Sequence, residues 1–434
     1  MPAHVRNALL AAAAAALAAC GTPPSADPAP LDRFSAPIAL GMSGSDLLVV
    51  SSNFELAYGL DDGGSVIPVD VQASPSTFGK GVRIASFAGE LSVADAAACG
   101  LPESLALVPA REGNALYRIG VGAGGELSCG AGCRLPLRSD VADAYGVLAV
   151  CRPPAVAGGE PRARAYVGFL RTPGSRGQIS EVDLRTGATR NRDVGLGPVR
   201  SFAYDAQTDR LFFTAIESGT TAPFRWLDLA GDCAIDAAVS EGGCPVFGMD
   251  LAVFLRGVEA RGMALSNPQD GRTRRAYVAA RVYNADLAGA IGGRPGFDVG
   301  GVLLVIDLVE ERSGLQPRVV GIYDVGLGAN EVKVLPPRPG MGDLVAVTAS
   351  DDGLLWIYDD EQGALVRVIG RDPHTGIPLF GRQPFGLAVR DDGAKARLFV
   401  SSFKDGFVTP IDIPLDAPWT AADPRVEDRI GVTP

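Results

Sequence analysis

The stretch Glu331–Gly370 reads EVKVLPPRPGMGDLVAVTASDDGLLWIYDDEQGALVRVIG and contains four short apolar segments. The turn-forming triplet DDG separates LVAVTA (Leu344–Ala349) from LWIYDD (Leu355–Asp360). EVKVLP (Glu331–Pro336) precedes this pair, and ALVRVI follows it after another turn. Short runs rich in Val, Ile, Leu and aromatic residues, bounded by Gly, Pro and Asp, are typical of β-strands joined by tight turns. The stretch therefore predicts a small four-stranded antiparallel sheet.

The same unit recurs along the chain. Segments similar to LVAVTA occur at Leu47–Ser52, Ala115–Ile119, Ala165–Phe169, Leu211–Ala215, Ala276–Ala280, Leu344–Ala349 and Leu398–Ser402. The partner strand ends in an aspartate at Asp70, Asp183, Asp228, Asp307, Asp359 and Asp412, and the second unit lacks this residue. A further strand precedes each unit, at Pro37–Met42, Ser104–Pro109, Tyr145–Val150, Arg200–Asp205, Arg261–Ser266, Glu331–Pro336 and Phe385–Arg390.

Four strands repeated seven times predict an all-β fold, a seven-bladed β-propeller of four-stranded blades. A single blade cannot bury both of its faces, so stacking the blades in a closed ring supplies the core. We expect the propeller to occupy residues 34–434, beginning inside blade one near Phe34. The segment Val426–Val432 is a candidate strand for closing the ring.

The strand–loop–strand unit that ends in Asp and is followed by a TG-like turn resembles the YVTN-repeat, lactonase-like propeller superfamily. The resemblance covers about residues 34–434. It implies the seven-bladed fold but no particular function, because propellers host unrelated activities. We interpret the repeated aspartate as a turn-forming residue, since Asp side chains bond to their own backbone in turns.

The N-terminus carries a targeting signal. Residues 1–19 combine one arginine, Arg6, with an uncharged run from Ala8 to Ala19 that is too short to span a bilayer. The following Leu17-Ala18-Ala19-Cys20 resembles the lipobox of bacterial lipoproteins, in which the cysteine is diacylated. We therefore expect a signal peptide at 1–19 and a lipidated Cys20 with a Pro-rich tether at 20–33. Gly21 after the cysteine resembles outer-membrane sorting, and an ordinary secretory signal is the alternative.

Composition narrows the possible functions. The net charge of −11 argues against a nucleic-acid partner bound through phosphates. The chain has two histidines, of which His4 lies in the predicted signal, so a multi-histidine metal site is excluded and a catalytic triad could use only His374. We expect no cofactor, with calcium as the one ion left open.

Six cysteines remain after Cys20, and an exported protein favours disulfides. We expect Cys233 to pair with Cys244 in a hairpin tip and Cys129 to pair with Cys133 across the CGAGC turn. Cys99 and Cys151 are then left over, although we place them at opposite ends of their blades. A metal knuckle at CGAGC is the alternative.

A candidate ligand site lies where the innermost strands begin, because propellers bind ligands at one end of the central channel. The aligned positions are Ser104, Tyr145, Arg200, Arg261, Glu331 and Phe385, and Asn330 adjoins them. Two arginines beside aromatic rings could hold a carboxylate or a sugar. We favour instead a self-neutralising Arg–Glu–Arg network that plugs the channel.

The primary hypothesis is a non-catalytic binding or scaffold module in the cell envelope, facing the periplasm or the cell surface. Its partners would be the lipid bilayer, through Cys20, and an unidentified protein or glycan. One alternative is a subunit of an outer-membrane assembly machine. The second alternative is a lactonase-like metal-dependent hydrolase that acts at the channel. Oxygen ligands for calcium would then come from Asn53, Asn284, Asp286, Asn330, Glu331, Asp351 and Asp405.

Overall fold

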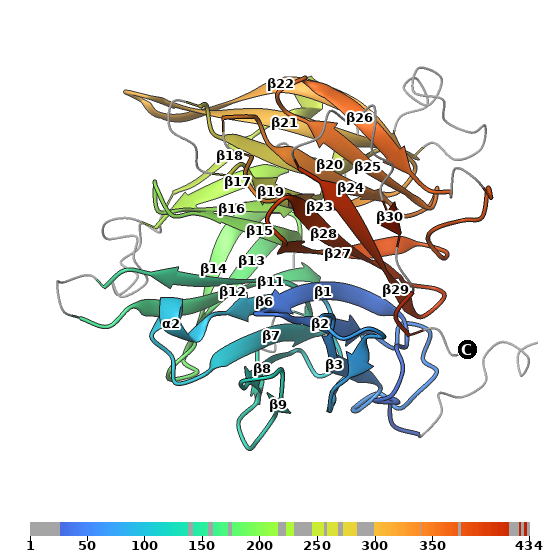
Figure 1. Cartoon of the computed structure of the whole chain (residues 1–434). Coiled ribbons are helices and arrows are strands. Elements are labelled where there is room, and N and C mark those ends of the chain that lie inside the picture. Colours follow the sequence, from blue (N-terminus) through green and yellow to red (C-terminus); the bar gives the residue numbers. More distant parts are fainter. Residues whose placement is uncertain are drawn as a thin grey trace, which may run out of the picture.

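The computed structural model describes residues 27–137, 142–154, 159–171, 176–215, 223–229, 245–255, 258–267, 272–283, 299–338, 340–371, 375–415, 425–426 and 429–431. These residues form seven antiparallel sheets arranged as the blades of a propeller (Figure 1). The predicted all-β, seven-bladed fold is confirmed. The helical elements of the described residues are the short helix α2 (Ala96–Cys99) and the 3₁₀ turn η3 (Leu251–Val253).

Each blade is contiguous in sequence, with its strands ordered from the channel outwards. The inner strands are β1 (Pro37–Ser43), β6 (Ser92–Ala94), β11 (Ala142–Arg152), β15 (Val199–Asp205), β19 (Val258–Leu265), β23 (Ala329–Val334) and β27 (Pro384–Asp391). The second strands are β2 (Asp46–Ser51), β7 (Ser104–Ala110), β12 (Arg162–Arg171), β16 (Arg210–Ala215), β20 (Arg275–Tyr283), β24 (Leu344–Ala349) and β28 (Lys395–Ser402). The third strands are β3 (Gly64–Asp70), β8 (Ala115–Val121), β13 (Arg176–Asp183), β17 (Phe224–Asp228), β21 (Val299–Glu311), β25 (Leu354–Asp359) and β29 (Phe407–Pro414).

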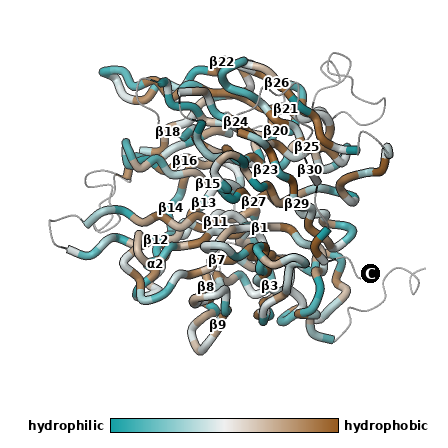
Figure 2. The backbone as a smooth tube through the Cα atoms, in the orientation of Figure 1, coloured by the Kyte–Doolittle hydropathy of each residue, from teal (hydrophilic) through white to brown (hydrophobic). Residues whose placement is uncertain are grey.

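The outer strands are β14 (Thr189–Leu196), β18 (Val246–Met249), β22 (Gly314–Gly326), β26 (Ala364–Ile369) and β30 (Arg425–Val426). In blades one and two the outer position is divided between β4 (Thr77–Phe78) and β5 (Val82–Ile84), and between β9 (Leu127–Ser128) and β10 (Arg134–Pro136). The hairpin of β21 and β22 projects beyond the ring at the upper left (Figure 1), and its tip is hydrophilic (Figure 2).

The core lies between neighbouring blades. β2 and β24 are buried along their whole length because both faces of each blade pack against another blade. Leu48 of blade one and Val108 of blade two, for example, belong to one apolar cluster. Burying a side chain of this size contributes about 1.5–3 kcal/mol, which is why runs without strict alternation form these strands.

The inner strands share an irregularity near their starts. In β1, β11, β15, β19, β23 and β27 the pairing register with the second strand shifts, as it does at a β-bulge. We call the end of the channel at which the inner strands begin the bulge end. The bulge brings backbones of adjacent blades close together: a Cβ on Gly146 would lie 1.6 Å from the Arg200 carbonyl oxygen. Glycine is therefore required at Gly146.

Blade two departs from the predicted strand assignment. Ser104–Pro109, expected as the inner strand, lies in the second strand β7, and Ala115–Ile119 lies in the third strand β8. The inner strand is β6, which the repeat alignment passed over. The third strand β8 ends without the aspartate that the other third strands carry at or near their ends.

The revised strand assignment of blade two also determines where its disulfides lie. The structure pairs Cys99 with Cys151 and Cys129 with Cys133. Cys99 and Cys151 lie at the same end of their blades, contrary to our expectation, because α2 connects the inner strand of blade two to its second strand and Cys151 is near the end of β11. Cys233 and Cys244 lie outside the described residues, as does Cys20.

The chain ends meet the propeller differently from the prediction. The expected tether is partly packed: Ala29 is fully buried and donates its backbone N–H to Asp62. The C-terminal strand β30 completes its own blade rather than joining blade one. Ring closure comes from side-chain packing instead, since Ile430 and Phe34 belong to one apolar cluster. No helix within the described ranges is long and apolar enough to cross a membrane.

Candidate functional site

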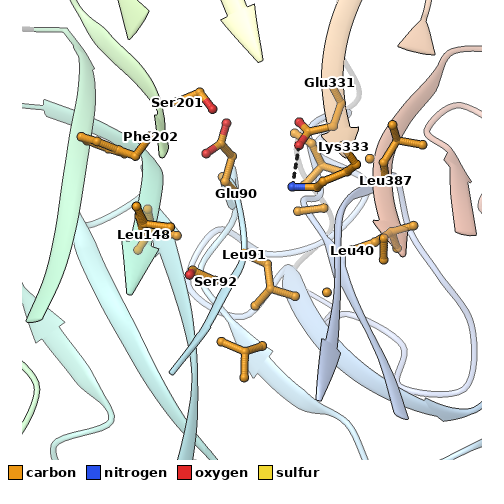
Figure 3. Close-up of a pocket in the computed structure, with 18 of the residues that line it drawn as sticks. Leu40, Glu90, Leu91, Ser92, Leu148, Ser201, Phe202, Glu331, Lys333 and Leu387 are labelled. Atoms are coloured by element: carbon orange, nitrogen blue, oxygen red, sulfur yellow. Dashed lines mark ion pairs between the residues drawn. The ribbon is translucent and has the colours of Figure 1, made fainter. Parts of the chain in front are cut away.

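The inner strands surround a cavity of about 380 Å³ on the propeller axis. Leu40, Leu91, Leu148, Phe202 and Leu387 line it together with polar and charged groups (Figure 3). All seven inner strands or the residues just before them contribute to the lining. Charged groups gather toward the bulge end, so the cavity offers polar groups beside apolar side chains.

Arg200 is the central charged group at the bulge end. It is only 2% exposed. Its Nη2 donates to Asn330 Oδ1 at 2.6 Å, and its guanidinium carbon lies 5.2 Å from the Tyr145 ring centroid and 6.0 Å from that of Phe385. The structure thus brings four predicted site residues together, although Arg200 and Asn330 themselves do not line the cavity surface.

The bonding of Arg200 is incomplete. Its Nε and Nη1 atoms are buried and have no hydrogen-bond partner, and no carboxylate among the described residues pairs with it. Leaving a buried guanidinium without a counter-charge is costly, because the aromatic rings return only part of the lost hydration. Burial of Tyr145 raises the pKa of its hydroxyl, and the positive charge of nearby Arg200 opposes this rise.

The expected Arg–Glu–Arg plug does not form. Arg261 pairs with Glu259 of its own strand, and Glu331 pairs with Lys333 at 3.0 Å. Burial, together with Arg200 and Arg281, lowers the pKa of Arg261 to about 10. The alignment placed Glu331 one residue out of step: within the bulge, Asn330 occupies the position of Arg200 and Arg261. Arg200 and Arg261, the predicted partners of Glu331, therefore contact Asn330 and Glu259 instead.

Two carboxyl groups face each other across the cavity. Glu90, just before β6, lies opposite Glu331 and Lys333 (Figure 3). Burial and the charge of Glu331 raise the pKa of Glu90 to about 8. Glu90 therefore carries a proton at neutral pH, and it could donate a hydrogen bond to a ligand.

Sequence reasoning missed Glu90, Lys333 and Glu259. Glu90 was hidden by the blade-two assignment, which passed over β6. Lys333 and Glu259 are each two residues from a predicted site residue, Glu331 and Arg261. Alternate residues of a strand share a face, so the period-two rule could have found both for a regular strand, but the bulge disturbs that rule before Met263.

The residues considered for calcium are dispersed among other contacts. Asn53 bonds to Tyr58, Gly59 and Ser86, which shapes its own loop. Asp405 pairs with Arg382, and Asp351 accepts a bond from Ser350. Asn284, Asp286 and His374 lie outside the described residues. Among the residues that the structure describes, no three His, Cys, Asp or Glu side chains gather as a metal site would require.

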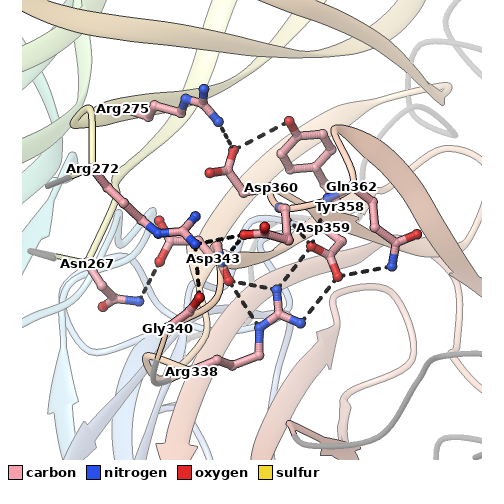
Figure 4. Close-up of polar contacts among 12 residues, drawn as sticks. Asn267, Arg272, Arg275, Arg338, Gly340, Asp343, Tyr358, Asp359, Asp360 and Gln362 are labelled. Carbon is pink, nitrogen blue, oxygen red and sulfur yellow. Dashed lines mark hydrogen bonds and ion pairs between the residues drawn. The ribbon is translucent and has the colours of Figure 1, made fainter.

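The repeated aspartates lie at the end opposite the bulge end, where third strands finish. Asp183 and Asp359 each accept backbone N–H bonds from the turn that follows, as the turn interpretation expected. Asp359 also forms a buried two-bond ion pair with Arg338 at 3.0 and 3.2 Å (Figure 4). A small polar pocket beside it is lined by Asp343, Asp360 and Arg275. Arg275 donates to Asp360, and Asn267 donates to Asp343. This cluster satisfies its own charges and joins blades five and six.

Comparisons with known proteins bear on the fold. No protein-family model matches the chain, and no curated protein matches it. Among solved structures, hydrazine synthase of Kuenenia stuttgartiensis is similar, with a TM-score of 0.58 and 13% identity, over 88% of this chain and 97% of that one.

Two further solved structures are similar to the chain. Sqt1 of Chaetomium thermophilum has a TM-score of 0.50 and 14% identity, over 94% of this chain and 89% of that one. A candidate 6-phosphogluconolactonase of Bacteroides uniformis has a TM-score of 0.50 and 12% identity, over 80% of this chain and 86% of that one. At such identities the likeness establishes the fold alone.

Proposed function

We propose that this chain is a lipoprotein of the bacterial outer membrane whose propeller binds an anionic ligand at the bulge end of its channel. The lipid would be attached at Cys20, as the lipobox-like sequence indicates. The role is binding rather than catalysis, and the ligand is an acidic sugar or a glycan bearing one. Lipobox, cavity and Arg200 each support a separate part of this proposal.

The observation that carries the proposal is the buried, incompletely bonded guanidinium of Arg200. An arginine presents a planar fork of donors that matches a carboxylate bidentately. Nε and Nη1 of Arg200 lack partners and lie on opposite sides of the guanidinium, while Nη2 between them is bonded to Asn330. An arriving carboxylate would accept a hydrogen bond from one of these two atoms, share Nη2 with Asn330, and supply the missing negative charge.

The surrounding groups suit a sugar acid. The rings of Tyr145 and Phe385 lie beside the guanidinium, and aromatic rings stack on the apolar faces of sugars. Protonated Glu90 and the ion-paired Lys333 offer hydrogen-bond donors to hydroxyl groups further along the cavity. A ligand bound in this way would be recognised at its carboxylate and at its ring face.

The test is a thermal-shift titration of the purified protein with D-glucuronate, with neutral D-glucose as the comparison ligand. Wild type should be stabilised by glucuronate and not by glucose. Arg200→Gln should bind glucuronate about tenfold to a hundredfold more weakly, which corresponds to losing a hydrogen-bonded charge pair. Without ligand its melting temperature should be unchanged or higher, because an uncompensated buried charge is removed.

Arg225→Gln is the matched control. Arg225 is another buried arginine, but it lies on the third strand β17, away from the inner strands, and donates to the Val194 carbonyl at 2.9 Å. This variant should keep the glucuronate response. An equal response in wild type and Arg200→Gln would refute the proposed site. A large fall in the melting temperature of Arg200→Gln without ligand would instead support a structural plug.

A lactonase-like hydrolase is the second candidate, and Glu90 is the observation that favours it. A cavity carboxyl with its pKa raised to about 8 could serve as a general acid or base. Hydrolysis of glucono-δ-lactone, followed with and without added calcium, separates the two functions. We expect no turnover above the uncatalysed rate. Turnover that Glu90→Gln abolishes would favour the hydrolase.

A further inference from the structure

Exposed apolar side chains are distributed unevenly over the propeller. Twelve large hydrophobic residues among those described are exposed, and five of them lie on outer strands. One, Met341, lies at the end opposite the bulge end. The other six lie in loops of the bulge end: Phe54, Leu56, Leu60, Val253, Phe254 and Ile377. Phe54 is 49% exposed and Val253 is 77% exposed.

Strand topology fixes which loops belong to the bulge end. Each inner strand starts there, so in an antiparallel blade the second strand returns there. The loop from β2 to β3, which holds Phe54, Leu56 and Leu60, therefore lies at the bulge end. So do the connections from an outer strand to the next inner strand, which hold η3 with its neighbour Phe254, and Ile377. These residues come from different blades around the channel mouth.

The described chain begins at the same end. The Asp27 carbonyl accepts the backbone N–H of Gly59, and the Ala29 carbonyl accepts Arg83 Nε at 2.9 Å. Gly59 lies in the loop between Leu56 and Leu60. The N-terminal segment is thus fastened to the bulge-end loop of blade one, beside its exposed leucines.

The length of chain before this point limits the orientation. From Cys20 to Asp27 there are seven residue steps, which span at most about 25 Å when fully extended. A six-residue strand such as β2 alone spans about 20 Å. Turning the opposite end toward a membrane would use nearly all of the reach of the segment, whereas the bulge end meets the membrane with the segment relaxed.

We propose that the bulge end lies against the bilayer, with Phe54, Leu56, Leu60, Val253, Phe254 and Ile377 dipping into the interfacial region. This inference rests on the lipid anchor of the proposed function. Apolar side chains gain free energy when they leave water for the interface, and several together reinforce an acyl anchor. Some charges among these loops are paired, as in Lys404 with Glu55 and Arg382 with Asp405. The channel mouth would then open toward the membrane surface.

The test places a fluorophore at each end of the propeller. Phe54→Trp reports on the bulge end and Met341→Trp on the opposite end, where a similarly exposed residue is replaced. The full lipidated proteins are reconstituted in phosphatidylcholine vesicles, with or without lipids brominated near the headgroup. Fluorescence is compared with that of wild type to subtract the three native tryptophans. We expect bromine to remove most of the added fluorescence of Trp variants at position 54 and little of that at 341.

Each outcome decides a separate point. The orientation would be overturned if both variants were quenched equally or if Met341→Trp were quenched more strongly. Flotation of the protein with the vesicles would still support the lipid anchor in that case. Protein that neither floats nor is quenched would overturn the anchor and this inference together. The glucuronate titration is made without vesicles, so its result stands independently of both.

Discussion

At the scale of single residues, the fold changes the protonation state of Glu90 at neutral pH. Its pKa is raised from 4.5 to about 8 by burial and by Glu331 across the cavity. The folded protein therefore holds a proton that the unfolded chain releases near pH 4.5. The stability linked to this proton is fully present below pH 4.5 and is lost as the pH rises through about 8.

Wild type should consequently lose thermal stability between pH 7 and pH 9, and Glu90→Gln should lose less. The glutamine keeps the shape and the neutral state but cannot ionise. Melting temperatures measured across this range in low-salt buffer check the expectation. Glu331→Gln should also reduce the loss, because it removes the second cause of the raised pKa. Parallel pH profiles in wild type and Glu90→Gln would show that Glu90 is already charged at pH 7.

At the scale of elements, four blades share a charge pair between the second and third strands. Arg164 stands opposite Asp183, Arg210 opposite Asp228, Arg275 opposite Asp307 and Arg397 opposite Asp412. In blade one two carboxyl groups meet instead, because Asp46 stands opposite Asp70. Burial and the neighbouring Asp70 raise the pKa of Asp46. Like charges directly opposite each other weaken a strand pair.

We therefore expect Asp46→Asn to stabilise the protein at pH 7, by up to about 1 kcal/mol. The gain should shrink as the pH falls, because Asp46 of wild type then takes up a proton and no longer repels Asp70. Asp183→Asn is the control with opposite sign, because Asp183 pairs with Arg164 and holds the turn at Thr186. Urea unfolding at pH 7 and pH 4 gives the comparison. Destabilisation by Asp46→Asn at pH 7 would contradict the account.

The strand pattern predicted the architecture because second and third strands are buried on both faces and carry dense apolar runs. The strand pattern failed in blade two, because the inner strand β6 has only three residues and gives a weaker sequence signal than β7 and β8. It also misplaced Glu331 by one residue, since a bulge breaks the alternation on which alignment depends. Arg200, Tyr145 and Phe385 were found because each lies two residues before regular pairing of its inner strand resumes. The contact of Arg200 with Asn330 arises between blades, which no local pattern specifies.

At the scale of the whole molecule, the propeller is closed by packing between blades one and seven. Phe34, Ile430 and Val408 share an apolar cluster at this junction, and β1 contacts β27 at the channel. The N-terminal segment that precedes Phe34 is anchored by backbone bonds to blade one. A lipid at Cys20 would thus be connected to a rigid body through a short segment of sequence.

Cys20→Ser should release the protein from membranes, because the signal would no longer carry acyl chains. Partitioning of expressed wild type and variant between detergent and aqueous phases measures the effect. Wild type should enter the detergent phase and the variant should remain in the aqueous phase. Equal partitioning of the two proteins would refute lipidation at Cys20 while leaving the Arg200 site untouched.

The central claim is that Arg200 binds an anion at the bulge end of the channel. The most direct measurement is anomalous X-ray diffraction from crystals soaked in sodium bromide, with Arg200→Gln crystals treated in the same way. We predict a bromide peak within hydrogen-bonding distance of Arg200 Nε or Nη1 in wild type and no peak there in the variant. A wild-type map with bromide elsewhere and none at Arg200, or the same peak in both proteins, would contradict it.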